Sequence, residues 1–155
     1  HSLDDLVNQA KDLLGITNGD VKVWVEVESD LEVDCDRFEV VSILMSLMGT
    51  SLNSARQVQN GHMCVKANRD GHSFIRIEVI DNGPGYPSEE MEWLFRNYDP
   101  ARRQRNGLSA ACPRLCSTRQ LVEELGGDVG AESLEGEGTM FWFSIPRAQA
   151  VMLAA

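Results

Sequence analysis

The stretch "HMCVKANRDGHSFIRIEVI", residues 62–80, constrains the fold most, because it predicts two paired strands and the turn that joins them. Apolar and polar residues alternate over residues 62–67 and again over residues 73–80, as in strands with one buried face. The intervening "NRDG" contains Asp-Gly, a strong signal for a hairpin turn. We therefore expect two antiparallel strands, the second of which ends at Asp81.

Helical and strand periods precede this hairpin. "SLDDLVNQAKDLLG", residues 2–15, has apolar residues at helical spacing, and Ser2 is a candidate N-cap. "VKVWVEV", residues 21–27, places four valines on one face of a strand. Asp36 is followed three residues later by a glutamate, which resembles a capping box, and it opens a largely apolar segment that reaches about Arg56. We expect this segment to be a central buried helix.

The remaining chain continues this alternation. We expect a short helix at residues 88–95, a long loop over 97–112, a helix at 117–127, and strands at 129–132 and 139–145. The order of elements predicts an α+β fold, a two-layer α/β sandwich in which a mixed, mostly antiparallel sheet carries helices on one face. One domain is expected over residues 1–146, followed by a C-terminal tail or linker at 147–155.

Composition excludes several classes of protein. A formal charge of −10 over 155 residues disfavours nucleic acid as a partner, because nucleic-acid binders carry a basic face. No apolar run is long enough to span a membrane. The cysteines form no Cys-x-x-Cys pair and, with His62, match no common metal-ligand spacing, which favours reduced thiols; they are Cys35, Cys64, Cys112 and Cys116. We expect a soluble cytoplasmic domain of a longer protein, with membrane attachment of the whole left open.

"DNGPGYP", residues 81–87, is the candidate functional segment. Asn-Gly is a common hairpin turn, but a hairpin needs a strand directly afterwards, and here two prolines lead into an acidic helix start. The alternative is a carboxylate, Asp81, that faces a cavity at the end of a strand. Gly83 and Gly85 would then let the backbone run close beneath a flat ligand.

Four stretches in order resemble the ATP-binding catalytic domain of sensor histidine kinases, a member of the Bergerat-fold or GHKL ATPases. They are "NSAR" at residues 53–56, "DNGPG", "MEWLFRNY" and "LVEELGGDVGAESLEGEGTMFWFSIP". A lone Asp-x-Gly-x-Gly is weak, but the order and spacing of the four blocks are specific. The resemblance covers residues 2–146 and implies the Bergerat ATP-binding fold.

The resemblance implies a pocket for adenine. Asp81 would accept a hydrogen bond from the adenine amino group, while Gly83, Gly85 and Tyr86 belong to the block that passes beneath the base. Thr139 would line the far wall of the pocket. By propensity alone a threonine that opens a strand is unremarkable.

The resemblance also implies the binding of Mg²⁺ and phosphates. Asn53 would offer its side-chain oxygen to Mg²⁺, and Arg56 would approach a phosphate, although both residues are equally typical of a solvated helix end. In the loop "DPARRQRNG", one arginine, for which we take Arg103, is expected to reach the phosphates. An ordinary solvated run of charge is the alternative.

Two departures from the family pattern bear on phosphate binding. "CPRL", residues 112–115, stands where the family has Gly-x-Gly-Leu, and Pro113 lacks the N–H that would contact an anion. The family block that "NSAR" resembles has a second asparagine position upstream, and Gly49 stands there. An ungapped alignment places Met48 rather than Asn53 at the metal-binding position, and we prefer Asn53 because the downstream spacing then fits.

The resemblance therefore predicts a protein histidine kinase domain that binds Mg-ATP and passes the γ-phosphate to a histidine on a separate upstream dimerisation domain. A response-regulator receiver domain would take the phosphate next. No catalytic residue is expected within this chain, which should be monomeric alone and homodimeric in the full-length protein. The alternatives are a degenerate domain that serves as a docking module, and an ATPase of the same fold with another acceptor.

Overall fold

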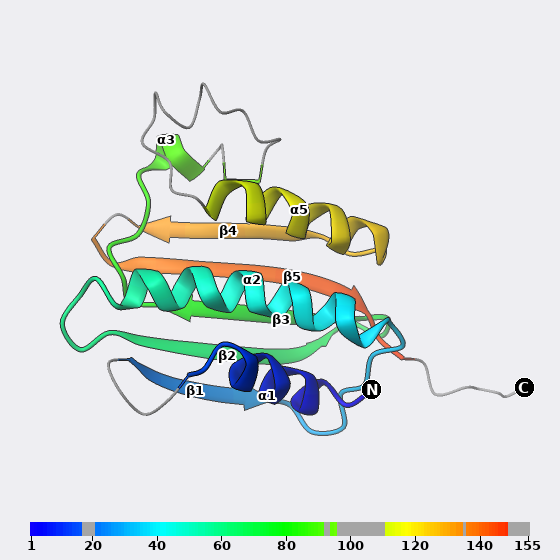
Figure 1. Cartoon of the computed structure of the whole chain (residues 1–155). Coiled ribbons are helices and arrows are strands. Elements are labelled where there is room, and N and C mark those ends of the chain that lie inside the picture. The colour runs from blue at the N-terminus through cyan, green and yellow to red at the C-terminus, as the bar shows by residue number, and fades with distance from the viewer. Residues whose placement is uncertain (17–20, 92–93, 96–110, 135, 149–155) are drawn as a thin grey trace, which may run out of the picture.

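The computed structural model describes residues 1–16, 21–91, 94–95, 111–134 and 136–148. Five strands form one sheet in the order β1-β2-β3-β5-β4 (Figure 1). The strands are β1 (Lys22–Val27), β2 (His62–Asp70), β3 (Phe74–Asp81), β4 (Val129–Leu134) and β5 (Gly138–Pro146). Strands β1 and β2 are parallel and all other pairs are antiparallel, so the predicted mixed sheet is confirmed.

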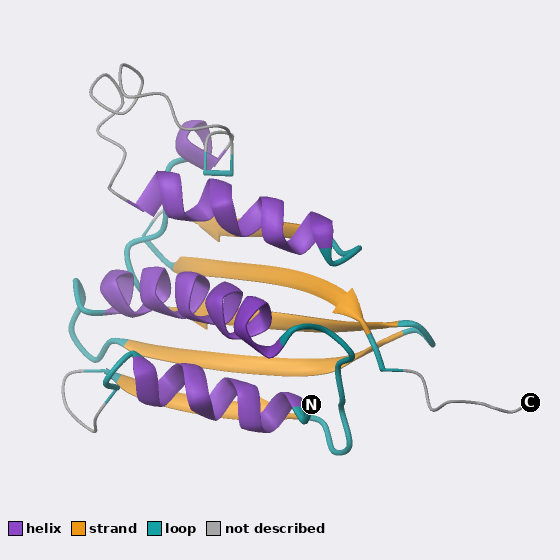
Figure 2. Ribbon diagram, turned by 45° about the vertical axis from the view of Figure 1, so that its right-hand side comes forward, coloured by secondary structure: helices purple, strands orange, loops and turns teal. Residues whose placement is uncertain are grey.

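The long helices lie on one face of this sheet (Figure 2). They are α1 (Leu3–Leu13), α2 (Arg37–Ala55) and α5 (Ala111–Glu124). The helix α2 connects the parallel strands β1 and β2, and it lies between α1 and α5, both of which it contacts. The short helix α3 (Ser88–Met91) lies beside β4. The predicted two-layer α/β sandwich is therefore confirmed.

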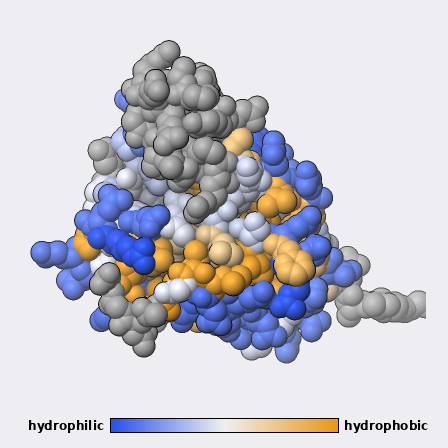
Figure 3. All heavy atoms as spheres, viewed as in Figure 1, coloured by the Kyte–Doolittle hydropathy of each residue, from blue (hydrophilic) through white to orange (hydrophobic). Residues whose placement is uncertain are grey.

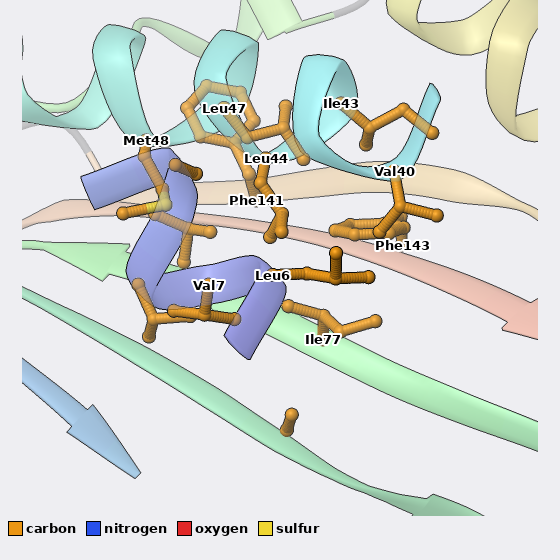
Figure 4. Packing of buried hydrophobic residues seen from close by; sticks show 14 of the residues in the cluster. Leu6, Val7, Val40, Ile43, Leu44, Leu47, Met48, Ile77, Phe141 and Phe143 are labelled. Carbon is orange, nitrogen blue, oxygen red and sulfur yellow. The ribbon is translucent and has the colours of Figure 1, made fainter. Parts of the chain in front are cut away.

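The core lies between the helices and the sheet (Figure 4). Alternate residues of each central strand point toward the helices, and the burial of β3 and β5 follows this period of two. The last inward position of β3 is Asp81 and the first of β5 is Thr139, so two polar side chains occupy the end of an otherwise apolar layer. The apolar members of these two strands are Ile75, Ile77, Val79, Phe141, Phe143 and Ile145.

The sequence of α2 explains its central place. Its N-cap is Asp36, whose side chain accepts hydrogen bonds from the backbone N–H groups of Phe38 (2.8 Å) and Glu39 (3.3 Å), as predicted. Apolar residues on several sides of the helix pack against the sheet, α1 and α5 together. Near its C-terminal end, Asn53 and Arg56 are exposed. On the helix-bearing face apolar residues form a band across the middle (Figure 3).

Two helix predictions differ from the structure. The helix expected from Ser117 begins at Ala111, so "CPRL" and the last two residues of the expected loop are helical. Pro113 is tolerated there because the first turn of a helix needs no N–H donor for its own hydrogen bonds. The helix expected over residues 88–95 is described only as Ser88–Met91, with a turn at Leu94. Residues 96–110, which include most of the predicted loop, lie outside the described residues.

Smaller differences concern a cap and a turn. Ser2 is the N-cap residue of α1, but its side chain makes no capping hydrogen bond. Its backbone instead pairs with Glu32 in an isolated bridge. The β2–β3 hairpin turns one residue later than a tight Asp-Gly turn would, because Asp70 pairs with Phe74 and Gly71 adopts a φ of +70° in the three-residue loop.

Both ends of the described chain meet at residues 31–33. The N-terminal ammonium of His1 donates to the carbonyl oxygen of Val33 (3.0 Å). Arg147 forms an isolated bridge with Val33, and the N–H of Ala148 donates to the carbonyl oxygen of Glu32 (2.9 Å). Across the part of the chain that the structure describes, no helix has the length and apolar character needed to cross a bilayer.

Candidate functional site

A polar row crosses three strands at one end of the sheet. Ser133 of β4 pairs in register with Thr139 of β5, which pairs with Asp81 of β3. Thr139 and Asp81 are each only 3% exposed. Because directly paired residues share a face of a sheet, all three side chains lie on the side that bears the helices. They form a polar floor where the apolar core ends.

The Asp81 carboxylate has one satisfied and one unsatisfied oxygen. Its Oδ1 accepts a hydrogen bond from the backbone N–H of Gly83 (2.9 Å). Its Oδ2 is buried and has no hydrogen-bond partner among the described residues. Buried carboxylate oxygens are costly to leave unpaired, so such an atom indicates a missing donor. The arrangement can accept a hydrogen bond from a ligand group that reaches the end of β3.

Several groups set the ionisation of Asp81. Burial raises the pKa of this carboxyl, and the N–H of Gly83, the hydroxyls of Ser51 and Ser54, and the nearby His62 oppose that rise. The Ser51 hydroxyl is close enough to lower the pKa, yet its Oγ lies in no hydrogen bond of acceptable geometry and is itself buried.

Tyr86 shares this environment. Burial, followed by the charges of Asp81 and Glu90, raises the pKa of Tyr86 to about 12. A negative charge on Asp81 is therefore felt by the phenol of the neighbouring loop, which remains protonated at neutral pH.

The glycines of "DNGPG" allow the backbone after β3 to lie against α2. A Cβ on Gly83 would overlap the Oγ of Ser54 and would lie 2.6 Å from the Ser54 carbonyl oxygen, so only glycine fits. Gly85 has a φ of +73°, in the left-handed region that glycine adopts without strain. The segment from Gly83 to Tyr86 is therefore held close to the C-terminal half of α2.

The same segment is tied to the β4–β5 turn. The N–H of Tyr86 donates to the Oγ of Ser133 (2.7 Å), and the N–H of Gly136 donates to the carbonyl oxygen of Pro84. Figure 1 shows the chain after β3 passing beside this turn on its way to α3. The site is thus built where α2, the segment after β3 and the β4–β5 turn meet. A hollow of about 320 Å³ at these strand ends is lined by Ile80, Asp81, Glu132, Ser133, Glu137, Gly138, Thr139 and Met140. The side chains of Ile80, Glu132 and Met140 alternate with the inward row and point away from the helices, so this hollow is not the space between Asp81 and α2.

Asn53 and Arg56 lie at the exposed end of α2. The Nη1 of Arg56 is 3.4 Å from the Oδ1 of Asn53, a long hydrogen bond between two exposed side chains. Ser54, the next residue after Asn53, is the one that contacts Gly83. Met48, which the ungapped alignment would place at the metal position, is fully buried in the core (Figure 4).

The other predicted phosphate contacts are not placed. Arg103 and its neighbours Arg102 and Arg105 lie outside the described residues. "CPRL" supplies the beginning of α5, and Leu115 at its end is fully buried. Within the described ranges, no group of three or more His, Cys, Asp and Glu side chains could hold a metal ion.

Sequence reasoning did not single out three serines that complete the site: Ser51, Ser54 and Ser133. Ser54 could have been found, since it directly follows Asn53 on a helix whose end was expected at the site. Ser51 and Ser133 carry no local signal, because their contacts come from residues 30 and 47 positions away, Asp81 and Tyr86.

Solved structures of histidine kinases share this fold. The catalytic domain of histidine kinase ThkA superposes with a TM-score of 0.76 at 23% identity, over 95% of this chain and 94% of that one. Full-length ShkA in complex with AMPPNP gives a TM-score of 0.80 at 21% identity, over 98% of this chain and 31% of that one. The fold is therefore that of histidine kinase catalytic domains.

Sequence comparison shows the family. The model of the histidine kinase-, DNA gyrase B-, and HSP90-like ATPases matches residues 35–149, and the chain belongs to this family. Sensor histidine kinase AruS of Pseudomonas aeruginosa is 32% identical over 121 residues, which cover 73% of this chain and 12% of that protein. Sensor histidine kinase WalK of Bacillus subtilis is 26% identical over 122 residues, which cover 77% and 20%. The chain thus spans a fifth or less of the length of these two relatives.

Proposed function

We propose that this domain binds Mg-ATP and presents the γ-phosphate to a histidine on a separate domain of the same protein. The observation that carries the proposal is the buried Oδ2 of Asp81, which has no donor among the described residues. An adenine amino group is such a donor, and a carboxylate that can only accept hydrogen bonds suits it. ShkA, which shares the fold, has been crystallised with the ATP analogue AMPPNP.

The glycine segment suits the flat face of a base. Gly83 leaves no side chain between the end of α2 and the space above Asp81, and Gly85 turns the chain away in a left-handed conformation. Thr139, paired with Asp81, offers a hydroxyl at the same edge. In this proposal the base lies between these groups, with its amino edge directed at Asp81.

Mg²⁺ and the phosphates would be held at the end of α2. The amide oxygen of Asn53 is a suitable ligand for a hard cation, with phosphate oxygens and water as the other ligands. The burial of Met48 favours the alignment that assigns this role to Asn53. Arg56 would turn from Asn53 to a phosphate. Bound Mg²⁺ would offset phosphate charge, and the chain's own task is to position the nucleotide, since phosphoryl transfer needs little covalent chemistry from the protein.

The partners follow from this chemistry. We propose an upstream dimerisation domain that carries the acceptor histidine, a full-length homodimer, and a receiver domain of a response regulator. Histidine kinase ThkA has been solved in complex with response regulator protein TrrA. The use of ATP as a substrate favours a cytoplasmic location for the domain. The net charge of −10 disfavours nucleic acid as a partner.

Calorimetric titration with ATP and ADP, each with and without Mg²⁺, tests the proposal. We expect micromolar ATP binding that needs Asp81, and a Mg²⁺-dependent part that needs Asn53. Replacement of Arg102, Arg103 and Arg105 by alanine should weaken the binding of ATP more than the binding of adenosine. If this triple variant bound ATP as tightly as the wild-type protein does, a contact between these arginines and the phosphates would be excluded. Absence of heat with every nucleotide, from protein shown to be folded, would reject the proposed function.

A degenerate domain that acts as a docking module is the second candidate. It is favoured by the first turn of α5, where Pro113 cannot donate a hydrogen bond to an anion. The titration separates the two candidates, because a degenerate domain would bind ATP weakly or not at all. Restoring glycines at positions 112 and 114 should then raise the affinity for ATP without changing that for adenosine.

A further inference from the structure

Two buried side-chain atoms within the described residues lack a hydrogen-bond partner, and both are at the same place. They are the Oδ2 of Asp81 and the Oγ of Ser51. Ser51 is 0% exposed and lies in the C-terminal half of α2, close to Asp81 at the end of β3. The neighbouring Thr50 shows the usual solution for a helical hydroxyl, since its Oγ1 donates to the carbonyl oxygen of Ser46 (2.8 Å). Ser51 does not use that solution.

An unpaired hydroxyl at this position lowers stability. Alanine is a better helix former than serine, and a buried hydroxyl without a partner loses its hydration without compensation. Unsatisfied buried groups in a folded protein call for an explanation other than stability, and they gather at functional sites. The coincidence with the unsatisfied oxygen of Asp81 supplies that explanation.

We propose that Ser51 is a positioning residue of the nucleotide site, whose hydroxyl donates to Asp81 when the base binds and keeps that carboxylate charged and directed at the base. This inference rests on the proposed function. A carboxylate oxygen accepts two hydrogen bonds, so Oδ2 can take the Ser51 hydroxyl and the base amino group together. In the free protein the Ser51 hydroxyl and the Oδ2 of Asp81 do not form a complete hydrogen bond, and the two buried polar atoms lower the stability of the fold.

The surroundings of Asp81 support this role. Gly83 already engages Oδ1 through its N–H, so Oδ2 is the oxygen left for Ser51 and the ligand. The groups that face the carboxyl are Ser51 and Ser54 from α2, His62 from β2, and Tyr86 from the segment after β3. Of these, Ser51 is the one whose polar atom is both buried and unpaired.

The test compares Ser51→Ala with Ser42→Ala, an exposed serine of the same helix. In the free protein Ser51→Ala should change Tm by less than about 2 °C, because the gain from removing an unpaired hydroxyl is opposed by the loss of a group that lowers the pKa of the buried Asp81 carboxyl. Its ATP affinity should fall about tenfold, the effect of one hydrogen bond to a charged group. Ser42→Ala should leave affinity unchanged. A loss of affinity without a fall in Tm distinguishes positioning from a structural role, which would lower both.

A pH series and a second variant complete the test. Loss of the Ser51 hydroxyl removes one of the groups that lower the pKa of Asp81, so the acid midpoint of ATP binding should move to higher pH. His62 faces Asp81 in both proteins, so the comparison isolates the Ser51 hydroxyl. Ser51→Cys keeps the volume but donates weakly, and should resemble Ser51→Ala in affinity. Unchanged affinity and midpoint in both variants would overturn the inference.

The free protein separates this inference from the proposed function. Carbon-13 NMR of the Asp81 carboxyl follows its titration without nucleotide, and Ser51→Ala should raise that pKa. If wild-type protein bound no nucleotide, the proposed function would fall while this titration still reported on Ser51. If wild-type protein bound ATP and Ser51→Ala bound it equally at every pH, only the role of Ser51 would fall.

Discussion

Asp81→Asn should weaken nucleotide binding and stabilise the free domain. The amide has the shape of the carboxylate, and its oxygen can still accept from the N–H of Gly83, as Oδ1 does at 2.9 Å. The NH₂ group then replaces Oδ2, the buried oxygen that has no donor. A donor would face the amino group of the base, so the pocket would lose its hydrogen bond to adenine without a change in shape.

The loss in binding can be estimated from the bond removed. A hydrogen bond to a charged group contributes about 1.5–3 kcal/mol, which corresponds to about 10- to 100-fold in Kd. The magnitude should be the same for ATP and ADP, because both present the same base. Binding of inosine triphosphate, which has an oxygen in place of the amino group, should instead improve in Asp81→Asn.

The gain in stability depends on pH in a defined direction. Because burial raises the pKa of Asp81 in the folded protein, the carboxyl favours folding fully only below its unfolded pKa. This contribution is lost as pH rises through the folded pKa, where the buried group must ionise. The amide has no proton to lose, so Asp81→Asn should be more stable than wild type at neutral pH, and the difference should vanish near pH 3.

Calorimetry and urea unfolding measure both effects on the same preparations. Tight ATP binding by Asp81→Asn would refute the assignment of Oδ2 to the base. Equal stability of the two proteins at neutral pH would instead refute the reasoning that Asp81 is a buried charge without full compensation. Ser144, at the far end of β5, offers a control. Its Oγ accepts from the backbone N–H of Asp128 (3.1 Å), and Ser144→Ala should affect stability alone.

Three further predictions follow from the contacts. Gly83→Ala places a methyl group against the backbone of Ser54, so we expect adenosine binding to be lost and Tm to fall by about 5 °C, measured by calorimetry and thermal unfolding. Asn53→Ala should remove the Mg²⁺-dependent part of ATP binding and leave binding without Mg²⁺ intact; an unchanged Mg²⁺ dependence would exclude Asn53 as a ligand. Ser133→Ala removes the acceptor of the Tyr86 N–H, so amide exchange at Tyr86 should quicken, whereas Ser144→Ala should leave it unchanged.

The strands could be predicted from sequence because their burial has a period of two that is visible locally. Residues 74–81 show it most clearly, and the inward position of Asp81 follows from counting along the strand. The beginning of α5 could not be predicted in this way. Residues 111–116 lack a clear helical period, and the helix forms there with Leu115 buried in the core that other elements supply.

In the candidate site, too, features within one short motif could be predicted, whereas contacts between distant segments could not. Asp81 and Gly83 lie in one short motif, and the structure brings them into direct contact, a hydrogen bond that the sequence analysis did not predict. The contributions of Ser51 and Ser133 depend on chain segments that are distant in sequence. A serine on a helix or strand has many possible roles, and only the fold decides which partner it meets. The roles proposed for Asn53, Arg56 and Arg103 stay predictions.

Because both ends of the described chain contact residues 31–33, the chain could be reconnected in a different order. His1 and Arg147 each lie beside Val33, so the two residues are at most about two strand spacings apart. A short glycine linker between them should permit circular permutation, with new termini opened at the exposed β2–β3 turn near His72. The permuted protein should retain the fold and its nucleotide affinity. That result would show that neither property depends on where the chain begins and ends.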